Sequence, residues 1–245
     1  MKLIATDYDG TLNYNGVSAE TLEAIRIWRQ NGNAFGVVSG RGPEFIPELK
    51  KTLGEEFDYL VLGNGSYATD SEGNVLFTTE CSSVDVRAFV KDLLEWGAPI
   101  VFVNYENRYI RIVLAGQEGT YDYLLEDMPY IQSFYKVCTI YDDRNEVEPL
   151  ARKVEEKYGE HMNVLRNGRC LDLAPFGVDK AQGIRGICDV FGVDKRHVIA
   201  VGDELNDVAM LKAFKSYAMR HGNPKLTEYV DGVVESVAEV IEKEM

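Results

Sequence analysis

Residues 3–12 read LIATDYDGTL, a short apolar run that ends in two carboxylates and a glycine. An apolar run closed by turn-forming residues is typical of a buried strand. Asp7 and Asp9 are two positions apart, so on an extended chain their side chains share one face. Just past the strand the chain can turn and offer one carboxylate and a neighbouring carbonyl to a cation. The stretch therefore predicts a buried strand with acidic chemistry at its carboxyl end.

The segments on either side of this strand alternate between helix and strand patterns. Strands are expected at 34–38, 59–62, 197–201 and 216–219, with a hairpin at 66–69 and 75–78. Helices are expected from a Ser18 cap through 30, from Pro43 to near 54, and at 180–191, 206–214 and 237–243. Strands separated by helices of this length predict right-handed βαβ units and a parallel sheet.

The middle of the chain has a different pattern, in which neighbouring strands are joined by tight turns. Helices are expected at 84–96, 121–127 and 146–158, and strands at 100–105, 108–114, 134–141, 164–167 and 169–173. The first strand pair would turn through Glu106-Asn107 and the last about Asn167-Gly168. Such strands favour an antiparallel sheet with helices on one face. We therefore predict an α/β domain formed by residues 1–81 and 177–245, with an α+β module inserted at 82–176.

The composition excludes several classes of partner. A formal net charge of −14 repels nucleic acid and anionic membrane surfaces. No stretch approaches the roughly 20 apolar residues of a membrane span, and the apolar start is too short for a signal peptide. We expect a cytoplasmic monomer or homodimer. A phosphorylated small molecule stays compatible with this charge, because a divalent cation and a few basic side chains can reverse the potential inside one pocket.

Polar clusters follow the predicted strands of the parallel sheet. They are Asp7 to Thr11, Ser39-Gly40-Arg41, Asn64, and Gly202 to Asp207, while Lys180 opens a predicted helix. Ligands of open parallel sheets bind at the carboxyl ends of the strands. These segments are far apart in sequence, yet the predicted topology brings them to one edge.

The chemistry of these clusters suits a cation and a phosphate. Asp7, Asp9 and Asp203 offer a hard, all-oxygen site of the kind that Mg²⁺ prefers. Ser39 offers a hydroxyl beside backbone amides, and Lys180 a point positive charge. Taken singly, these residues would be read as helix caps, a turn and a surface lysine. The second acidic cluster, at a second strand end, favours the metal site over that reading.

In this order the clusters resemble the motifs of the haloacid dehalogenase superfamily. Asp7-x-Asp9-Gly10-Thr11 is similar to its first motif, Ser39 to its second, Lys180 to its third, and Gly202-Asp203-x-x-Asn206-Asp207 to its fourth. The insertion between the second and third motifs resembles the cap of the type IIB group. That group is often called Cof-like and contains sugar-phosphate phosphatases. The runs LDLAPFGVDK at 171–180 and GNP at 222–224 also look like that group.

The resemblance implies an α/β fold, with a Rossmann-like parallel sheet core and an inserted α+β cap. It also implies Mg²⁺-dependent hydrolysis of the phosphomonoester of a small metabolite, with sugar phosphates as the expected class, through an aspartyl-phosphate intermediate. Asp7 would be the nucleophile, and Asp9 the general acid and then the base. The Mg²⁺ would be held by the side chains of Asp7 and Asp203 and by the Asp9 carbonyl. The phosphate would be held by Ser39, Gly40, Lys180 and Asn206, with Thr11 and Asp207 in support.

Three other readings of the sequence stay open. A phosphotransferase of the phosphomannomutase type would share the motifs and pass the phosphoryl group to a sugar hydroxyl. A phosphometabolite-binding regulator would have no need of a nucleophile, so the intact carboxylate pair argues against it. A dinucleotide-binding domain is weaker still, because no G-x-G-x-x-G follows the first strand. The role of Asn64 is open, and Asp172 could either meet substrate hydroxyls or be a surface charge of a hairpin.

Overall fold

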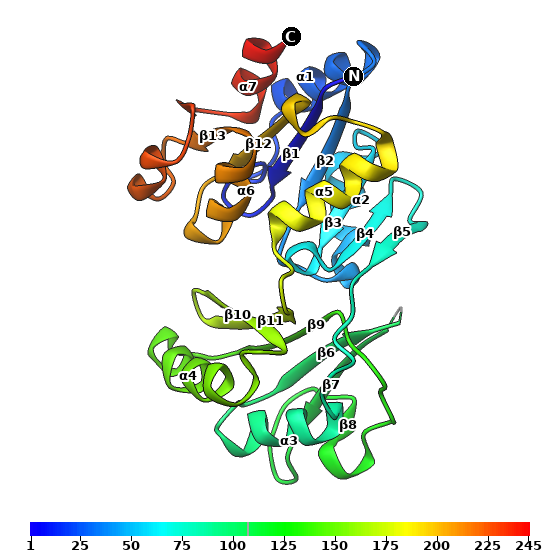
Figure 1. Cartoon of the computed structure of the whole chain (residues 1–245), viewed down its shortest axis with the longest axis vertical. Helices are drawn as coiled ribbons and strands as arrows, with labels where there is room; N and C mark the ends of the chain where they lie inside the picture. The colour runs from blue at the N-terminus through cyan, green and yellow to red at the C-terminus, as the bar shows by residue number, and fades with distance from the viewer. Residues whose placement is uncertain (107) are drawn as a thin grey trace. The chain divides into compact units, whose positions relative to one another are not determined.

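The computed structural model describes residues 1–106 and 108–245, which form two compact units. The first, here called the core unit, combines Met1–Phe77 with Asp179–Met245. The second, the inserted unit, is Thr78–Val178. The chain therefore leaves the core unit once and returns to it once (Figure 1).

The core unit is built on an eight-stranded sheet in the order β14-β13-β12-β1-β2-β3-β4-β5. Its strands are β1 (Leu3–Asp7), β2 (Ala34–Val38), β3 (Tyr59–Leu62), β4 (Tyr67–Asp70), β5 (Val75–Thr78), β12 (Val198–Gly202), β13 (Lys215–Met219) and β14 (Gly232–Val234). From β14 to β3 all neighbours pair in parallel, and β4 pairs antiparallel with β3. The predicted parallel α/β core is thus confirmed, and β14 is a strand that the sequence analysis did not anticipate.

β1 lies in the middle of the sheet, between β12 and β2. All its residues are buried, as expected for a strand covered on both faces. Leu3 is level with Val198 on one side and with Ala34 on the other, so the three strands run in step. Their carboxyl ends consequently come to the same edge of the sheet, and this edge carries the polar clusters.

Five α-helices accompany this sheet: α1 (Ala19–Gln30), α2 (Ile46–Leu53), α5 (Lys180–Phe191), α6 (Val208–Ala213) and α7 (Val237–Glu244). Short 3₁₀ turns lie at Pro43–Phe45, Gly63–Gly65, Lys195–His197, Leu205–Asp207 and Pro224–Glu228. The helices expected from Pro43 and from Asn206 each begin as one of these turns. The Ser18 cap of α1 is present, since its side chain accepts a hydrogen bond from the Thr21 amide at 3.1 Å.

The start of α5 is held close to the turn after β3 by two glycines. A Cβ atom on Gly65 would lie 2.1 Å from the Asp179 carbonyl oxygen, and one on Gly183 would lie 2.7 Å from the Gly65 Cα. Asp179 caps the helix, because its side chain accepts from the Gln182 amide at 2.7 Å. This close approach brings Lys180, the first residue of α5, to the edge where the parallel strands end.

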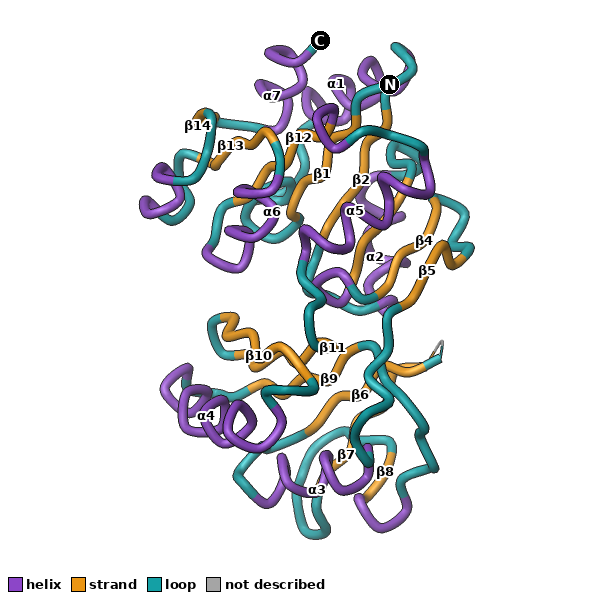
Figure 2. Tube along the Cα trace, viewed as in Figure 1, coloured by secondary structure: helices purple, strands orange, loops and turns teal. Residues whose placement is uncertain are grey.

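The inserted unit has a six-stranded sheet in the order β10-β11-β9-β6-β7-β8. Its elements are α3 (Val86–Glu95), β6 (Val101–Tyr105), β7 (Arg108–Val113), β8 (Tyr123–Leu124), β9 (Lys136–Ile140), α4 (Val147–Tyr158), β10 (Met162–Asn167) and β11 (Cys170–Pro175), with 3₁₀ turns at Leu125–Asp127 and Arg144–Glu146. The pairings are antiparallel except for β7 with β8. Figure 2 shows α3 and α4 beside this sheet, and residues of both helices share an apolar cluster with alternate residues of the strands.

One element of the inserted unit differs from the sequence expectation. Residues 121–127, expected as a helix, form β8 and a 3₁₀ turn instead. Tyr123 and Leu124 pair in parallel with Ile112 and Val113 of β7. These two residues therefore form the edge strand of the sheet. The expected turn through Glu106-Asn107 falls partly on residue 107, which lies outside the described residues.

The two ends of the inserted unit are tied together at His161. Its carbonyl oxygen accepts hydrogen bonds from the Phe176 amide at 3.1 Å and from the Cys81 thiol at 3.6 Å. Its Nδ1 lies 3.0 Å from the Ser83 hydroxyl oxygen. The segment that enters the inserted unit and the segment that leaves it are therefore neighbours.

Each unit also has an apolar core of its own. One cluster consists of residues between Cys81 and Leu173, and another of residues from Leu3 to Ala68 together with Ala181 to Leu226. Among the described residues, no helix is long and apolar enough to cross a membrane.

The separate cores predict that each unit folds without the other. A variant in which a short Gly/Ser bridge replaces 78–178 should keep helical circular dichroism and a cooperative thermal transition, and so should the excised segment 78–178 alone. The measurement is far-UV circular dichroism against temperature, with the full chain as control. A core unit without a cooperative transition would contradict the prediction.

Candidate active site

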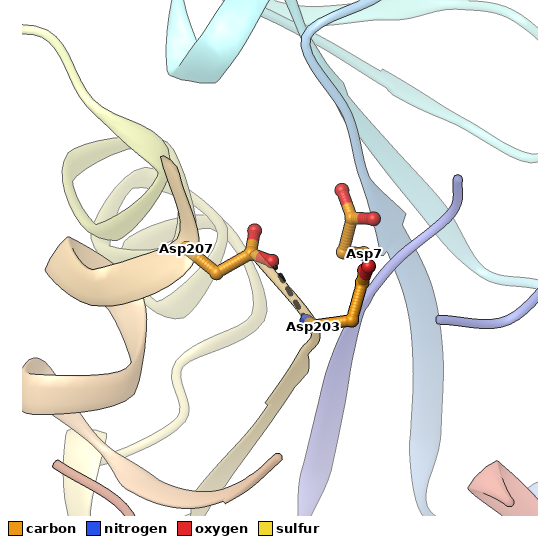
Figure 3. A group of neighbouring side chains, drawn as sticks. All are labelled: Asp7, Asp203 and Asp207. Carbon is orange, nitrogen blue, oxygen red and sulfur yellow. Dashed lines mark hydrogen bonds between the residues drawn. The ribbon is translucent and has the colours of Figure 1, made fainter. Parts of the chain in front are cut away.

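Three carboxylates gather at the carboxyl edge of the core sheet. They belong to Asp7 at the end of β1, Asp203 just after β12, and Asp207 at the start of α6, and in Figure 3 they face a common space. One oxygen from each lies within 4.8 Å of the others. Residues almost two hundred positions apart are thus neighbours because their strands are neighbours, as the topology requires.

Lys180 pairs with two of these three carboxylates. Its Nζ is 2.5 Å from Asp7 Oδ1 and 2.6 Å from Asp207 Oδ1, and its side chain is 1% exposed. A buried ammonium is stable only where it is paired and hydrogen-bonded. The lysine expected to be a phosphate ligand is therefore already bound between two carboxylates, and it joins the starts of α5 and α6 to the end of β1.

The cluster carries more negative than positive charge, and the pKa values respond to this excess. Burial, reinforced by Asp207 and Asp203, raises the pKa of Asp7 to about 8, although the Lys180 ammonium opposes the rise. Burial alone would lower the pKa of Lys180, but the carboxylates of Asp207 and Asp7 outweigh it and raise that pKa. Burial also raises the pKa of Asp203. One ammonium thus does not compensate three carboxylates, and a further cation would stabilise their ionised forms.

Asp203 and Asp207 are held by the backbone around them. Asp207 Oδ2 accepts from the amides of Asp203 at 3.0 Å and of Glu204 at 3.1 Å. The Thr11 hydroxyl donates to Asp203 Oδ1 at 2.6 Å. Thr11 therefore orients the Asp203 carboxylate, whereas Asp207 holds Lys180 and the backbone of the turn after β12.

The loop after β2 brings Ser39 and Gly40 to the same edge. The Ser39 hydroxyl oxygen accepts from the Arg41 amide at 3.1 Å, and its carbonyl accepts from the Asn64 amide at 3.1 Å. A serine hydroxyl that accepts one hydrogen bond can still donate its own proton. Asn64 is buried and left-handed, with φ 58°, so the observed contribution of this residue is to hold the Ser39 loop.

Asp9 is turned toward Arg41. Arg41 Nε lies 2.8 Å from Asp9 Oδ2 and its Nη2 lies 2.6 Å from Asp9 Oδ1, which makes a bidentate pair. The guanidinium is 4.3 Å from the centre of the Phe45 ring and 5.7 Å from that of Tyr8. The Asp9 side chain is 52% exposed, in contrast to the buried Asp7.

Two further predicted positions have defined surroundings. Asn206 Oδ1 is buried and has no hydrogen-bond partner in the part of the chain that the structure describes, so it is suited to a donor from outside the chain. Asp172 belongs to the inserted unit, is buried, and pairs with Lys136 Nζ at 3.0 Å. The alternative that Asp172 is a solvated charge of a hairpin is therefore wrong.

The donor set fits a divalent cation such as Mg²⁺. All the gathered ligand atoms are carboxylate oxygens, which hard cations prefer, and the cluster has an excess of negative charge. Asp207 is already engaged with Lys180 and two backbone amides, which leaves Asp7 and Asp203 as the better placed side-chain ligands. The assignment of Asp7, Asp203 and the Asp9 carbonyl as metal ligands stays a prediction, with which this cluster is compatible.

Two residues with defined contacts in this region, Arg41 and His221, have no role in the predicted site. Arg41 forms hydrogen bonds with the Asp9 side chain, and His221 forms one with the Gly10 carbonyl oxygen. Both partners are far away in the sequence. The available signals were an arginine directly after a strand-end Ser-Gly and a histidine directly before the Gly222-Asn223-Pro224 run.

Sequence comparison connects this site with known proteins. The family model of haloacid dehalogenase-like hydrolases matches residues 4–241. A putative phosphatase of Buchnera aphidicola is 28% identical over 92% of this chain and 87% of its own length. A Bacillus subtilis protein named 5-amino-6-(5-phospho-D-ribitylamino)uracil phosphatase is 26% identical over 96% of this chain and 90% of its own length. A putative bifunctional phosphatase/peptidyl-prolyl cis-trans isomerase of Streptococcus pyogenes is 24% identical over 98% of this chain, which spans only 52% of that protein.

Solved structures share the fold. A putative HAD/COF-like hydrolase from Plasmodium vivax superposes with a TM-score of 0.81 at 19% identity, over 99% of this chain and 95% of that one. A protein described as a HAD subclass IIB sugar phosphatase gives a TM-score of 0.79 at 17% identity, over 99% of this chain and 98% of that one. The chain thus belongs to the haloacid dehalogenase-like hydrolase family, and it is an enzyme of the phosphatase type.

Proposed function

We propose that this enzyme hydrolyses the phosphomonoester of a small metabolite, a sugar phosphate in class, through an aspartyl-phosphate on Asp7, and that it requires Mg²⁺. The observation that supports this most is the buried Asp7 carboxylate, held by Lys180 and adjacent to Asp203 at the carboxyl edge of the sheet. A carboxylate fixed in this way is already oriented for attack on an electrophile.

In the first step, an oxygen of Asp7 attacks phosphorus. Lys180 holds Oδ1, so we assign the attack to Oδ2. The Oδ2–P bond forms while the bond from phosphorus to the ester oxygen breaks, and the leaving oxygen takes a proton from Asp9. A bound Mg²⁺ would neutralise charge on the phosphate and favour the ionised form of Asp7.

In the second step, a water molecule attacks the phosphorus of the acyl phosphate. Asp9 accepts its proton, the Oδ2–P bond breaks, and inorganic phosphate leaves with Asp7 restored. Both steps need the Asp9 carboxyl beside the reacting oxygen. Asp9 must therefore exchange its pairing with Arg41 for that oxygen during turnover.

The phosphate oxygens would be bound by donors around this edge. An ammonium has three N–H donors, and Lys180 uses two of them on carboxylates. The third, together with the Ser39 hydroxyl, the Gly40 amide and the Asn206 side chain, would hold the transferring group. These donors favour developing negative charge in the transition state.

We propose that the inserted unit selects the substrate while the core unit performs the chemistry. The core supplies a nucleophile and phosphate donors but little to recognise the remainder of a metabolite. β11 of the inserted unit ends at Pro175, shortly before Lys180 in the sequence, so only a short segment of chain joins this strand to the lysine. The phosphometabolite and sugar-phosphate activities in the names of similar proteins support this substrate class.

A phosphotransferase would use the same first step and pass the phosphoryl group to a hydroxyl acceptor. The two activities differ in product. Stoichiometric release of inorganic phosphate from a panel of phosphorylated metabolites, in buffer without an added acceptor, identifies the hydrolase.

Replacing the nucleophile should abolish turnover without unfolding the protein. Asp7→Asn keeps the shape of the side chain but is a poor nucleophile, so phosphate release should fall more than about a thousandfold. The matched control is Asp189→Asn, an exposed position on α5, which should keep parental activity and melting temperature. An Asp7→Asn protein with substantial activity would remove Asp7 from the mechanism.

Removal of divalent cations should stop the reaction. Dialysis against a chelator should lower phosphate release by roughly a hundredfold or more, because the carboxylate cluster then repels the phosphate. Mg²⁺ should restore the activity. Ca²⁺ should restore it poorly, because this larger ion takes more ligands in a looser geometry. Full activity in excess chelator would rule out the metal assignment.

The core unit without residues 78–178 should retain slow hydrolysis of an activated aryl phosphate such as 4-nitrophenyl phosphate. It should also lose the parent's preference among metabolites, because the selecting surface is gone. The measurement is kcat/KM for each member of the panel, relative to the aryl phosphate. A folded variant that ranks the metabolites as the parent does would exclude the inserted unit as the selector.

A further inference from the structure

His221 joins two loops at the catalytic edge of the core unit. It follows β13, and its Nε2 lies 2.7 Å from the carbonyl oxygen of Gly10 in the loop after β1. A carbonyl oxygen can only accept, so Nε2 carries the hydrogen of this bond. The imidazole also stacks on Tyr14, with ring centres 3.7 Å apart and planes 15° from parallel. His221 therefore holds the loop after β1 at two points, Gly10 and Tyr14.

Between these two loops lies Asp203. A Cβ atom on Gly10 would be 2.3 Å from Asp203 Oδ2, and one on Gly222 would be 2.6 Å from the Asp203 carbonyl oxygen. Thr11, next to Gly10, donates to Asp203 Oδ1 at 2.6 Å. The amide of Asn223, close after His221, donates to the Asp203 carbonyl at 2.7 Å. Both loops thus pack directly on the acidic residue that faces Asp7, and His221 connects them on its outer side.

We propose that His221, stacked on Tyr14, is a positioning residue that keeps the Gly10 loop closed on Asp203 and so sets the spacing of the carboxylates that bind the divalent cation. This proposal rests on the metal requirement of the proposed function. Without the bond to its carbonyl, Gly10 can move away from Asp203, and Thr11 moves with it. The Asp203 carboxylate then loses the hydroxyl that orients it.

The contact is unsuited to a purely structural role. The Tyr14 side chain is 55% exposed and His221 is exposed as well, so their stacking removes little apolar surface from water. The global free energy of unfolding should therefore change little when the contact is lost. What it can change is the position of one short loop, and that loop lies against the proposed metal ligands.

The test measures cation binding directly, by titration calorimetry with Mn²⁺ on the full chain without substrate. His221→Ala should weaken Mn²⁺ binding roughly tenfold, the range found when groups that orient metal ligands are removed. The Mg²⁺ concentration for half-maximal activity should rise by a similar factor. kcat at saturating Mg²⁺ should stay close to the parent value, because the same carboxylates then surround the cation.

Four matched variants, two at His221 and two at Tyr14, separate the hydrogen bond from packing. His221→Gln places an amide N–H near the position of Nε2 and should keep Mn²⁺ affinity within about threefold of the parent. His221→Asn has a shorter amide that cannot reach Gly10 and should behave like His221→Ala. Tyr14→Phe keeps the stacked ring and should be neutral, whereas Tyr14→Ala should weaken Mn²⁺ binding in the same direction as His221→Ala. Thermal unfolding of each variant in chelator identifies any that fail to fold.

The outcomes are distinct. Unchanged Mn²⁺ affinity in a folded His221→Ala protein would overturn the proposal, and so would equal weakening in the Gln and Ala variants. A parent protein that binds no Mn²⁺ would overturn the metal assignment of the proposed function, and this inference with it. Weakened binding in the Ala and Asn variants, with rescue by Gln, supports His221 as the residue that closes the loop.

Discussion

The buried ammonium of Lys180 is the interaction on which the architecture of the site depends. It brings together the end of β1, the first residue of α5 and the turn that opens α6, through carboxylate contacts at 2.5 and 2.6 Å. Taking such a charge out of water is costly unless its partners are placed closely around it. The surrounding chain meets this requirement, because Gly65 and Gly183 let α5 begin this close to the sheet.

The same ammonium explains how an acidic chain can act on an anionic substrate. The net charge of −14 disfavours phosphate over most of the surface, and the carboxylate cluster disfavours it further. Lys180 offsets only part of that charge, which leaves an affinity for a hard cation beside Asp7 and Asp203. In the proposed function, recognition of the phosphate would be conditional on that cation, which the acidic residues would recruit.

Local signals predicted much of the fold. The bounds of β2, β3 and α5 agree with the predicted ranges, and the start of α1 agrees with the predicted Ser18 cap, because these signals depend only on neighbouring residues. The helix predicted at 121–127 is absent because Tyr123 and Leu124 pair with β7, a tertiary contact that overrides helical spacing. The candidate site residues came from strand-end clusters and their order. The contacts of Arg41 with Asp9 and of His221 with Gly10 span 32 and 211 residues, so local patterns can mark the two side chains but do not identify their partners.

The hydrogen bonds of His161 with both ends of the inserted unit affect how the core unit tolerates the insertion. A disordered loop of roughly a hundred residues would add several RT of closure entropy to the folding of its host. Here the inserted unit holds its own two ends together, through Cys81, Ser83 and Phe176, so that entropy is lost within the insertion itself. For the folding of the core unit, the entropy cost of closing the insertion is therefore similar to that of a short loop. Evolution can accordingly exchange or reshape it while the folding of the catalytic half stays unchanged.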